Sequence, residues 1–326
     1  MRFSVVIPLY NKAPYVEKAI RSVLSQTFTD YELVIVDDGS RDDSAQIANE
    51  VIAGHANCRL VKQENTGVAM ARNNGVAVSY GDYLCFLDAD DWWEPMFLEE
   101  MSRLIEALPD AGIYGTNYTI VNETKHKTRV AQVGVEQGFE QGYINYCQVY
   151  AKTMYMPLWT GAVCIPRRVF DEMKGFPEGV KLGEDFLLWI RIALKYKVAF
   201  LNKALVYYNQ DVEIANRGVG RLYAPNEHML WNLTDLEPLE QSNDDYKNLI
   251  DALRVTALMP YYLSKEHRYA ALSELNKVDW ELQSKKIKRE YKRPIGMLKV
   301  KHSLLKIGSI VKRKMLGYHH GSSNTD

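Results

Sequence analysis

Three carboxylates stand close together at the end of an apolar run. Residues 83–87 form the run, and Asp88, Ala89, Asp90 and Asp91 follow it. Such a run is typical of a buried strand, and its end delivers acidic side chains to one edge of a sheet. Because Asp88 and Asp90 alternate with Ala89, an extended backbone would point both carboxylates the same way. A like-charge pair of this kind is unfavourable unless a cation neutralises it.

The cation that these carboxylates favour is Mn²⁺ or Mg²⁺, since both ions prefer oxygen ligands. Carboxylates alone rarely complete an octahedral shell, and the remaining ligands usually come from water and substrate phosphates. We therefore expect a phosphorylated substrate. The structural alternative is that Asp90 and Asp91 cap a following helix, which Pro95 helps to start.

An alternation of strands and helices must position this edge of the sheet. In the first half of the chain this alternation favours a parallel sheet with right-handed crossovers. The expected strands cover residues 3–7, 33–36, 59–61 and 83–87, and the expected helices cover 14–24, 42–53 and 66–80. We expect Pro8 to end the first strand. Ligands of such sheets bind beyond the carboxyl ends of the strands. Polar residues that collect at those ends are Tyr10, Asn11, Asp37, Asp38 and Asn65.

The second half of the chain continues the α/β pattern and then becomes helical. Expected strands cover residues 113–118, 159–165, 199–201 and 205–208, and expected helices cover 95–108, 166–175 and the segment that begins at 183. Residues 122–142 show no pattern that we can assign. Residues 221–278 are predicted to form helices of mixed polarity. The predicted fold class is a Rossmann-like, mostly parallel sheet flanked by helices, followed by a helical C-terminal region.

Cysteine usage and the N-terminus bound the cellular context. The four cysteines, Cys58, Cys85, Cys147 and Cys164, show no CxxC spacing, which favours a reducing compartment without a zinc site. The N-terminus enters a strand pattern directly, and no apolar stretch is long enough to span a bilayer. We therefore expect no signal peptide and a cytoplasmic protein.

Charge is distributed unevenly along the chain. Residues 285–314 contain 12 Lys and Arg against one Glu, which leaves 28 basic and 40 acidic residues elsewhere. Apolar residues alternate with these charges, so a basic helix here could lie on an anionic membrane surface and make the protein peripheral to the inner face of the cytoplasmic membrane. The alternative is a solvated or self-associating helix, which would make the protein a homo-oligomer. We expect no nucleic-acid partner, because only one aromatic residue, Tyr291, lies among the charges, too few for a stacking platform.

Phosphate binding cannot rest on the common glycine-rich loops. The first strand lacks GxGxxG after it, and no Walker lysine loop occurs. Metal and arginine must then handle phosphate, and Arg72 is one candidate. The alternative for Arg72 is an ordinary surface arginine.

Six motifs in the first 91 residues resemble the signatures of glycosyltransferase family 2, in that family's order and spacing. They are SVVIPLYN (4–11), SQTF (25–28), VDDGS (36–40), NTG (65–67), ARNNG (71–75) and FLDADD (86–91). The resemblance covers residues 1 to about 210. It is specific for the family and weakly specific for the sugar. It implies a GT-A fold, a nucleotide-sugar donor and a divalent metal.

The resemblance also implies roles for individual residues at the donor site. Tyr10 and Asp38 would hold the nucleoside base, typically uracil, and Arg72 would meet the base or the diphosphate. Asp88 would approach the ribose, and Asp90, with Asp88 beside it, would bind the metal. Pro8, Asn11 and Ala89 would complete the donor site. Asp37 and Asp91 flank these positions and are expected to support the loops.

Glu184 and Asp185 match the family's acidic pair at the mouth of the acceptor site. An acceptor hydroxyl must lose its proton as it attacks the anomeric carbon, and a positioned carboxylate can take that proton. We predict that Asp185 is this base and that transfer inverts the anomeric centre. The alternative is that both residues only stabilise the dipole of the helix they begin.

Trp159 and Gly161 fit the family's acceptor-side strand, where an aromatic face can stack on a sugar. A buried core tryptophan is the alternative for Trp159. Many relatives carry a histidine soon after the last strand, and residues 207–211 lack it. We expect His228 to be an ordinary residue on a helix surface.

Together these features predict a metal-dependent inverting glycosyltransferase that uses a nucleotide sugar, with UDP-sugar expected, and a glycan or lipid-linked acceptor. The predicted catalytic domain covers residues 1–220, with a donor half at 1–110 and an acceptor half at 111–220. A helical extension at 221–326 follows, with the basic tail inside it. Two other hypotheses stay open, a non-catalytic nucleotide- or glycan-binding scaffold and a phosphatase of the haloacid dehalogenase type, which also places Asp-x-Asp after a strand.

Overall fold

The computed structural model describes residues 2–211 and 222–301 of the chain. By its internal contacts the chain forms two compact units. Among the described residues, the first contains residues 2–121, 128–211 and 222–249, and the second contains residues 122–127 and 250–301. The predicted division into domains at residue 220 stays a prediction. No helix within the described ranges is long and apolar enough to cross a membrane.

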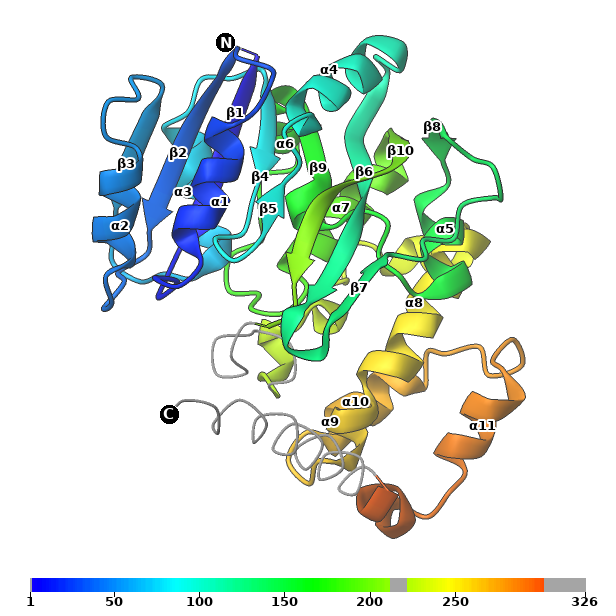
Figure 1. The fold of residues 1–326 in the computed structure, drawn as a ribbon. Helices are drawn as coiled ribbons and strands as arrows, with labels where there is room; N and C mark the ends of the chain where they lie inside the picture. The colour runs from blue at the N-terminus through cyan, green and yellow to red at the C-terminus, as the bar shows by residue number, and fades with distance from the viewer. Residues whose placement is uncertain (1, 212–221, 302–326) are drawn as a thin grey trace, which may run out of the picture. The chain divides into compact units, whose positions relative to one another are not determined.

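A mixed sheet forms the centre of the first unit (Figure 1). Its strands are β1 (Phe3–Leu9), β2 (Tyr31–Asp37), β3 (Cys58–Lys62), β4 (Tyr83–Phe86), β5 (Trp92–Trp93), β6 (Ala111–Asn122), β7 (Lys127–Val130), β8 (Gln141–Ile144), β9 (Val163–Pro166) and β10 (Lys197–Asn209). Their order in the described part of the chain is β3-β2-β1-β4-β9-β6-β10-β5, with β7 paired to β6 and β8 to β10. The four strands from β3 to β4 are mutually parallel, as the alternating pattern predicted.

Seven helices flank the sheet in the described part of this unit. They are α1 (Val16–Leu24), α2 (Ser44–Val51), α3 (Val68–Ala77), α4 (Phe97–Ala107), α5 (Tyr146–Thr153), α6 (Arg167–Glu172) and α7 (Glu184–Lys195). Figure 1 shows α1 in front of β1 and β2, α2 in front of β3, and α3 behind the sheet. This arrangement and the parallel half of the sheet confirm the predicted fold class.

Alternate residues of the parallel strands face two different helix layers. The odd-numbered residues of β1 pack in one core with Val16, Ala19, Ile20 and Val23 of α1. On the other face, α3 approaches the sheet closely at Gly75, because a Cβ there would lie 2.4 Å from Cγ1 of Val6. The period of two in the strands therefore buries both faces of the sheet.

The prediction that Pro8 ends the first strand is wrong. β1 continues to Leu9, and Pro8 pairs in register with Val36 of β2. Val6 accepts a hydrogen bond from the backbone of Leu87 on the β4 side, and residues two apart in a strand point the same way. Pro8 therefore turns its missing N–H toward the side where β4 has already ended, so no ladder bond is lost.

The second half of the sheet departs from the prediction in three places. The two strands expected at 199–201 and 205–208 are one strand, β10, with register shifts between Leu201 and Val206. The strand expected at 159–165 is shorter, because residues 160–162 form a 3₁₀ turn before β9. The unassigned stretch contains β7 and β8, and α5 follows it without having been predicted.

The second unit is helical, as predicted. α8 (Asp244–Ala257) enters it, and α9 (Met259–Leu263), α10 (Arg268–Leu275) and α11 (Lys285–Tyr291) follow. Its interior holds the fully buried Arg254, whose guanidinium contacts Asp251 at 3.4 Å and Glu274 at 3.2 Å. These two carboxylates compensate a charge that burial alone would make unfavourable.

Candidate functional site

The carboxylates after β4 lie on a turn and not on an extended strand. β4 ends at Phe86, and the backbone of Asp91 donates to the carbonyl of Asp88 at 3.0 Å. The predicted extended backbone at Asp88 to Asp90 is therefore wrong. The turn sends the two carboxylates to different cations, since Asp88 contacts Arg72 at 2.6 Å and Asp90 contacts Lys12 at 2.5 Å.

The helix-capping alternative is also wrong. α4 begins only at Phe97, and its N-cap residue is Met96. Asp91 is buried and accepts hydrogen bonds from the indole of Trp159 at 3.1 Å and from the backbone of Asn209 at 2.9 Å. Asp91 thus ties the turn to the segment before β9 and to the end of β10, as a residue that supports the loops would.

Burial makes negative charge costly on this turn. Burial raises the pKa of Asp90; Lys12 opposes this shift, and Asp88 adds to it. Burial raises the pKa of Asp91 further, and the charges of Asp90 and Asp88 add to the effect. A cation placed among these carboxylates would stabilise their ionised forms.

The turn suits a divalent ion that takes part of its ligand shell from a substrate. Asp90 and Asp88 supply the oxygen ligands that Mg²⁺ and Mn²⁺ prefer. Within residues 2–211 and 222–301, no group of three or more His, Cys, Asp or Glu could hold a metal by itself. Asp90 already holds a cation, the ammonium of Lys12. The residues therefore fit a metal that phosphate oxygens help to coordinate, and Ala89, buried between the two carboxylates, offers only backbone groups.

The ends of β1 and β2 bring the residues predicted to bind the base to the same edge. The register pairs Leu9 with Asp37, so the following residues Tyr10 and Asp38 leave the sheet at one level. Tyr10 is 41% exposed, as a stacking surface needs to be. Pro8 lies within β1, and Asn11, which follows Tyr10 in the loop, accepts a hydrogen bond from the backbone of Arg41 at 2.8 Å.

Asp38 is buried and holds the loop before α3. Its Oδ1 accepts from the backbone of Thr66 at 2.8 Å and from Gln63 at 2.7 Å, and its Oδ2 accepts from the backbone of Gly67 at 2.9 Å. Asp37 likewise supports its loop, accepting from the backbone of Ser40 at 3.0 Å. Contact of Asp38 with a base stays a prediction.

Arg72 is a buried link and not a surface arginine. Only 3% of it is exposed, and its two terminal nitrogens contact Asp88 at 2.6 Å and Glu184 at 3.0 Å. Its guanidinium also lies 5.1 Å from the ring centroid of Phe176. The carboxylates raise the pKa of Arg72 although burial opposes them. Arg72 thus joins the turn after β4 to the start of α7.

The acidic pair begins α7 at the predicted position. Gly183 precedes it with a φ of 81°, and a Cβ there would lie 2.7 Å from Met229. Burial, and then Asp185, raises the pKa of the Glu184 side chain to about 7, while Arg72 opposes the shift. Asp185 is less buried, and both of its oxygens accept hydrogen bonds, from the hydroxyl of Thr160 and from the backbone of Phe186, each at 2.7 Å. Its carboxylate is therefore fixed in orientation.

Trp159 and Gly161 lie on the turn before β9. Trp159 is partly exposed, and its ring packs against Tyr208 with centroids 4.1 Å apart. Gly161 is buried and its carbonyl accepts from the indole of Trp93 at 2.7 Å. Trp159 is therefore not a fully buried core residue. Its stacking on a sugar stays a prediction.

Sequence reasoning missed three residues at this edge and misplaced a fourth. Lys12, Thr160 and Tyr208 carried no pattern that separates them from ordinary loop or strand residues. His228 was wrongly predicted to be on a surface, since it is 2% exposed and its Nδ1 accepts from the backbone of Leu230 at 3.1 Å. Burial lowers its pKa to about 4, so His228 is neutral at physiological pH.

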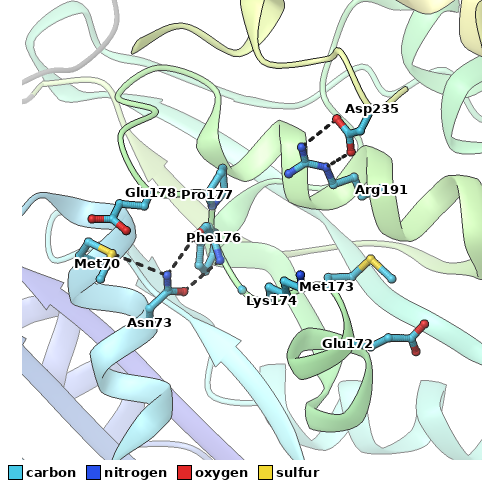
Figure 2. A pocket seen from close by; sticks show the side chains of 11 residues that line it. Met70, Asn73, Glu172, Met173, Lys174, Phe176, Pro177, Glu178, Arg191 and Asp235 are labelled. Carbon is cyan, nitrogen blue, oxygen red and sulfur yellow. Dashed lines mark hydrogen bonds and ion pairs between the residues drawn. The ribbon is translucent and has the colours of Figure 1, made fainter. Parts of the chain in front are cut away.

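A cavity of about 550 Å³ is lined in part by Phe176, and none of the predicted site residues line it. Figure 2 shows Asn73 at its edge, joined to the backbone of Phe176 by two hydrogen bonds of 2.9 Å, and Arg191 paired with Asp235. Its lining charges are of both signs and largely paired. We place the chemistry at the turn after β4, because desolvated carboxylates gather there and not in this cavity.

Comparison with known proteins identifies the family. The model for glycosyl transferase family 2 matches residues 4–163. An uncharacterized glycosyltransferase of Rickettsia felis is 33% identical over 261 residues, which make up 79% of this chain and 40% of that protein. Glycosyltransferase GlyA of Streptococcus pneumoniae is 30% identical over 215 residues, or 64% of this chain and 30% of GlyA. The chain belongs to glycosyltransferase family 2, as its motifs predicted, and spans less than half the length of these two relatives.

Solved structures share the fold. Staphylococcus aureus TarS, residues 1–349 in complex with UDP-GlcNAc, superposes with a TM-score of 0.69 at 19% identity, covering 84% of this chain and 80% of that one. The mannosyltransferase PcManGT of Pyrobaculum calidifontis, in complex with GDP-Man and Mn²⁺, gives a TM-score of 0.53 at 18% identity, covering 86% and 88%. The fold is therefore that of the GT-A glycosyltransferases.

Proposed function

We propose that this chain is a metal-dependent inverting glycosyltransferase. It moves a sugar from a nucleotide sugar, a UDP-sugar in the first instance, to a hydroxyl of a glycan or lipid-linked acceptor in bacterial surface polysaccharide biosynthesis. The observation that carries the proposal is the link through Arg72. By contacting both Asp88 and Glu184, this arginine brings the predicted metal-binding turn and the predicted base Asp185 to one edge of the sheet.

Support for the donor and product classes comes from the relatives. TarS was solved with UDP-GlcNAc, and PcManGT with GDP-Man and Mn²⁺. The chondroitin synthase of Escherichia coli is 29% identical over 231 residues, which are 69% of this chain and 31% of that enzyme. The phosphatase hypothesis loses its basis, since the acidic motif here follows the fourth strand, and the family match assigns this motif to a glycosyltransferase domain.

In the proposed reaction, the acceptor hydroxyl gives its proton to Asp185 as its oxygen attacks the anomeric carbon. The bond from that carbon to the diphosphate breaks, and the nucleoside diphosphate leaves with the bonding electrons. A bound divalent ion would supply charge neutralisation for the leaving group. Thr160 and the backbone of Phe186 hold Asp185 in one orientation, and two carboxylate lone pairs stay available to the acceptor.

Titration of the protein with UDP-GlcNAc, with and without Mn²⁺, tests the proposed function. We expect Mn²⁺ to strengthen the binding of UDP-GlcNAc by at least tenfold. We also expect UDP to be released slowly in the presence of Mn²⁺. Asp90→Asn should remove the Mn²⁺ effect, whereas Asp30→Asn, at an exposed position, should keep it. The proposed function would be wrong if the protein neither bound nor turned over UDP, GDP or their nucleotide sugars.

We infer further that the basic tail at 285–314 holds the protein on an anionic membrane surface. Its described part exposes Lys285, Lys286, Arg289 and Lys292. Three apolar side chains nearby in sequence are also exposed, Leu282 at 66%, Met297 at 64% and Val300 at 60%. Residues 302–314 of the tail lie outside the described residues.

Vesicle binding tests the membrane proposal. Changing Lys285, Lys286, Arg289 and Lys292 to Gln together should release the protein from phosphatidylserine vesicles, since each basic residue near the surface adds about 1 kcal/mol. This variant is better than truncation, because Leu298 is fully buried and its loss would open the second unit. Neutral phosphatidylcholine vesicles, which should bind neither protein, serve as the control. Unchanged binding to phosphatidylserine would contradict the proposal.

A further inference from the structure

We propose that Lys12 is an additional donor-binding residue, which neutralises Asp90 in the free protein and moves to the donor's diphosphate when a metal takes Asp90. The proposal rests on the proposed function, because it requires a metal at Asp90 and a diphosphate beside it. It assigns a role to a residue that follows directly after the SVVIPLYN motif.

The contact between Lys12 and Asp90 is short and shielded from water. Nζ of Lys12 lies 2.5 Å from Oδ2 of Asp90, and the two side chains are 15% and 17% exposed. The residues are 78 positions apart in the sequence. An ion pair at this degree of burial is screened less by salt than an exposed one. Lys12 therefore stands where a cation bound to Asp90 would stand.

The backbone of Lys12 is fixed, whereas its side chain can turn. Its N–H donates to the hydroxyl of Ser44 at 2.7 Å, and its carbonyl accepts from the backbones of Tyr15 and Val16 at 2.9 and 3.0 Å. These bonds anchor the loop between Tyr10 and α1. The lysine side chain has a flexible four-carbon stem, so the ammonium can change partners while the loop stays in place.

A metal and an ammonium cannot share one oxygen of Asp90, because like charges at contact distance repel strongly in a poorly solvated site. A metal bound there must displace Lys12. The diphosphate that the metal coordinates is then the nearest uncompensated anion for the ammonium. The charge of Arg72 is already compensated by Asp88 and Glu184, each of which contacts one of its terminal nitrogens, whereas the ammonium of Lys12 would lose its partner.

The proposal predicts changes of opposite sign for two ligands in the variant Lys12→Met. Affinity for Mn²⁺ alone should rise about tenfold, because the metal no longer displaces an ammonium. Affinity for UDP in the presence of saturating Mn²⁺ should fall about tenfold, because one charge-assisted contact to the diphosphate is lost. Electron paramagnetic resonance measures free Mn²⁺, and isothermal titration calorimetry measures UDP binding.

Matched variants separate this role from a general change in charge or fold. Lys197→Met removes the lysine of another Lys–Asp pair, with Asp110 at 3.6 Å and both side chains exposed, and should leave both affinities unchanged. Lys12→Arg keeps the charge and should keep UDP affinity within threefold. It also serves as the second variant if Lys12→Met unfolds.

The proposal is overturned if Lys12→Met binds Mn²⁺ no more tightly than the unaltered protein, or if its affinity for UDP does not fall. It is also overturned if neither protein binds Mn²⁺ when UDP is present. The proposed function fails separately, when the unaltered protein neither binds nor turns over a nucleotide sugar. Normal turnover of UDP-GlcNAc together with an inert Lys12 would leave glycosyl transfer standing and remove only the role of Lys12.

Discussion

Asp185→Asn is expected to lower sugar transfer by about 10³-fold while nucleotide-sugar affinity stays within twofold. A general base contributes on the order of 10² to 10⁴ in rate, and an amide cannot accept the proton at neutral pH. The change should not disturb the fold. The amide oxygen can still accept from the backbone of Phe186, and the amide nitrogen can donate to Thr160, whose hydroxyl can rotate to accept.

The measurement compares UDP release and UDP-GlcNAc binding in the same preparations. Asp171→Asn makes the same chemical change at an exposed position on α6 and should leave both quantities unaltered. Turnover above a tenth of the original rate in Asp185→Asn would show that another group takes the proton. Loss of donor binding would instead place Asp185 at the donor and not at the acceptor.

Arg72→Met is expected to lower the free energy of unfolding by about 3 to 5 kcal/mol, as the loss of one partner from a buried ionic group does. Asp88 and Glu184 would lose their shared cation, with side chains that are only 28% and 11% exposed. The ring of Phe176 would also lose the guanidinium beside it. The deficit should be larger at pH 8 than at pH 5.5. The pKa of Glu184 is raised to about 7 although Arg72 opposes the rise, so removing Arg72 should raise this pKa further. The extra cost then appears as the pH rises above about 7, where Glu184 is ionised in the unaltered protein, and is absent at pH 5.5, where Glu184 is protonated in both folded proteins.

Urea unfolding of the two single variants, their combination and a control tests this coupling. Arg72→Met combined with Glu184→Gln should be less destabilised than the sum of the single changes by at least about 1 kcal/mol, since the two residues are in contact. Arg21→Met removes a guanidinium from an exposed pair with Glu17 and should cost less than about 0.5 kcal/mol. Additive effects of Arg72→Met and Glu184→Gln would mean that the two residues do not depend on each other.

Patterns of local period predicted the elements that are buried on both faces. The apolar runs that became β1, β2 and β4, and the three-four spacing in α1, follow from residues whose burial is decided within a few neighbours, whereas β3 is only partly buried. Elements of the second half were harder to predict. β10 is one strand because β6 pairs along most of its length across three irregularities, and no local pattern shows that pairing. The eight-residue α5 and the two-residue β5 were too short to leave a clear periodic signal.

The sequence by itself determined that polar residues would gather at one edge of the sheet, because the carboxyl ends of parallel strands all lie on the same side. It also carried the family motifs and the start of α7 at its acidic pair. Only the tertiary structure decided which charges meet there. Lys12 reaches Asp90 across 78 positions, and Arg72 reaches Glu184 across 112. A local pattern fixes the side of an element on which a residue lies, but the partner on that side depends on how distant segments pack, and packing is a property of the whole fold.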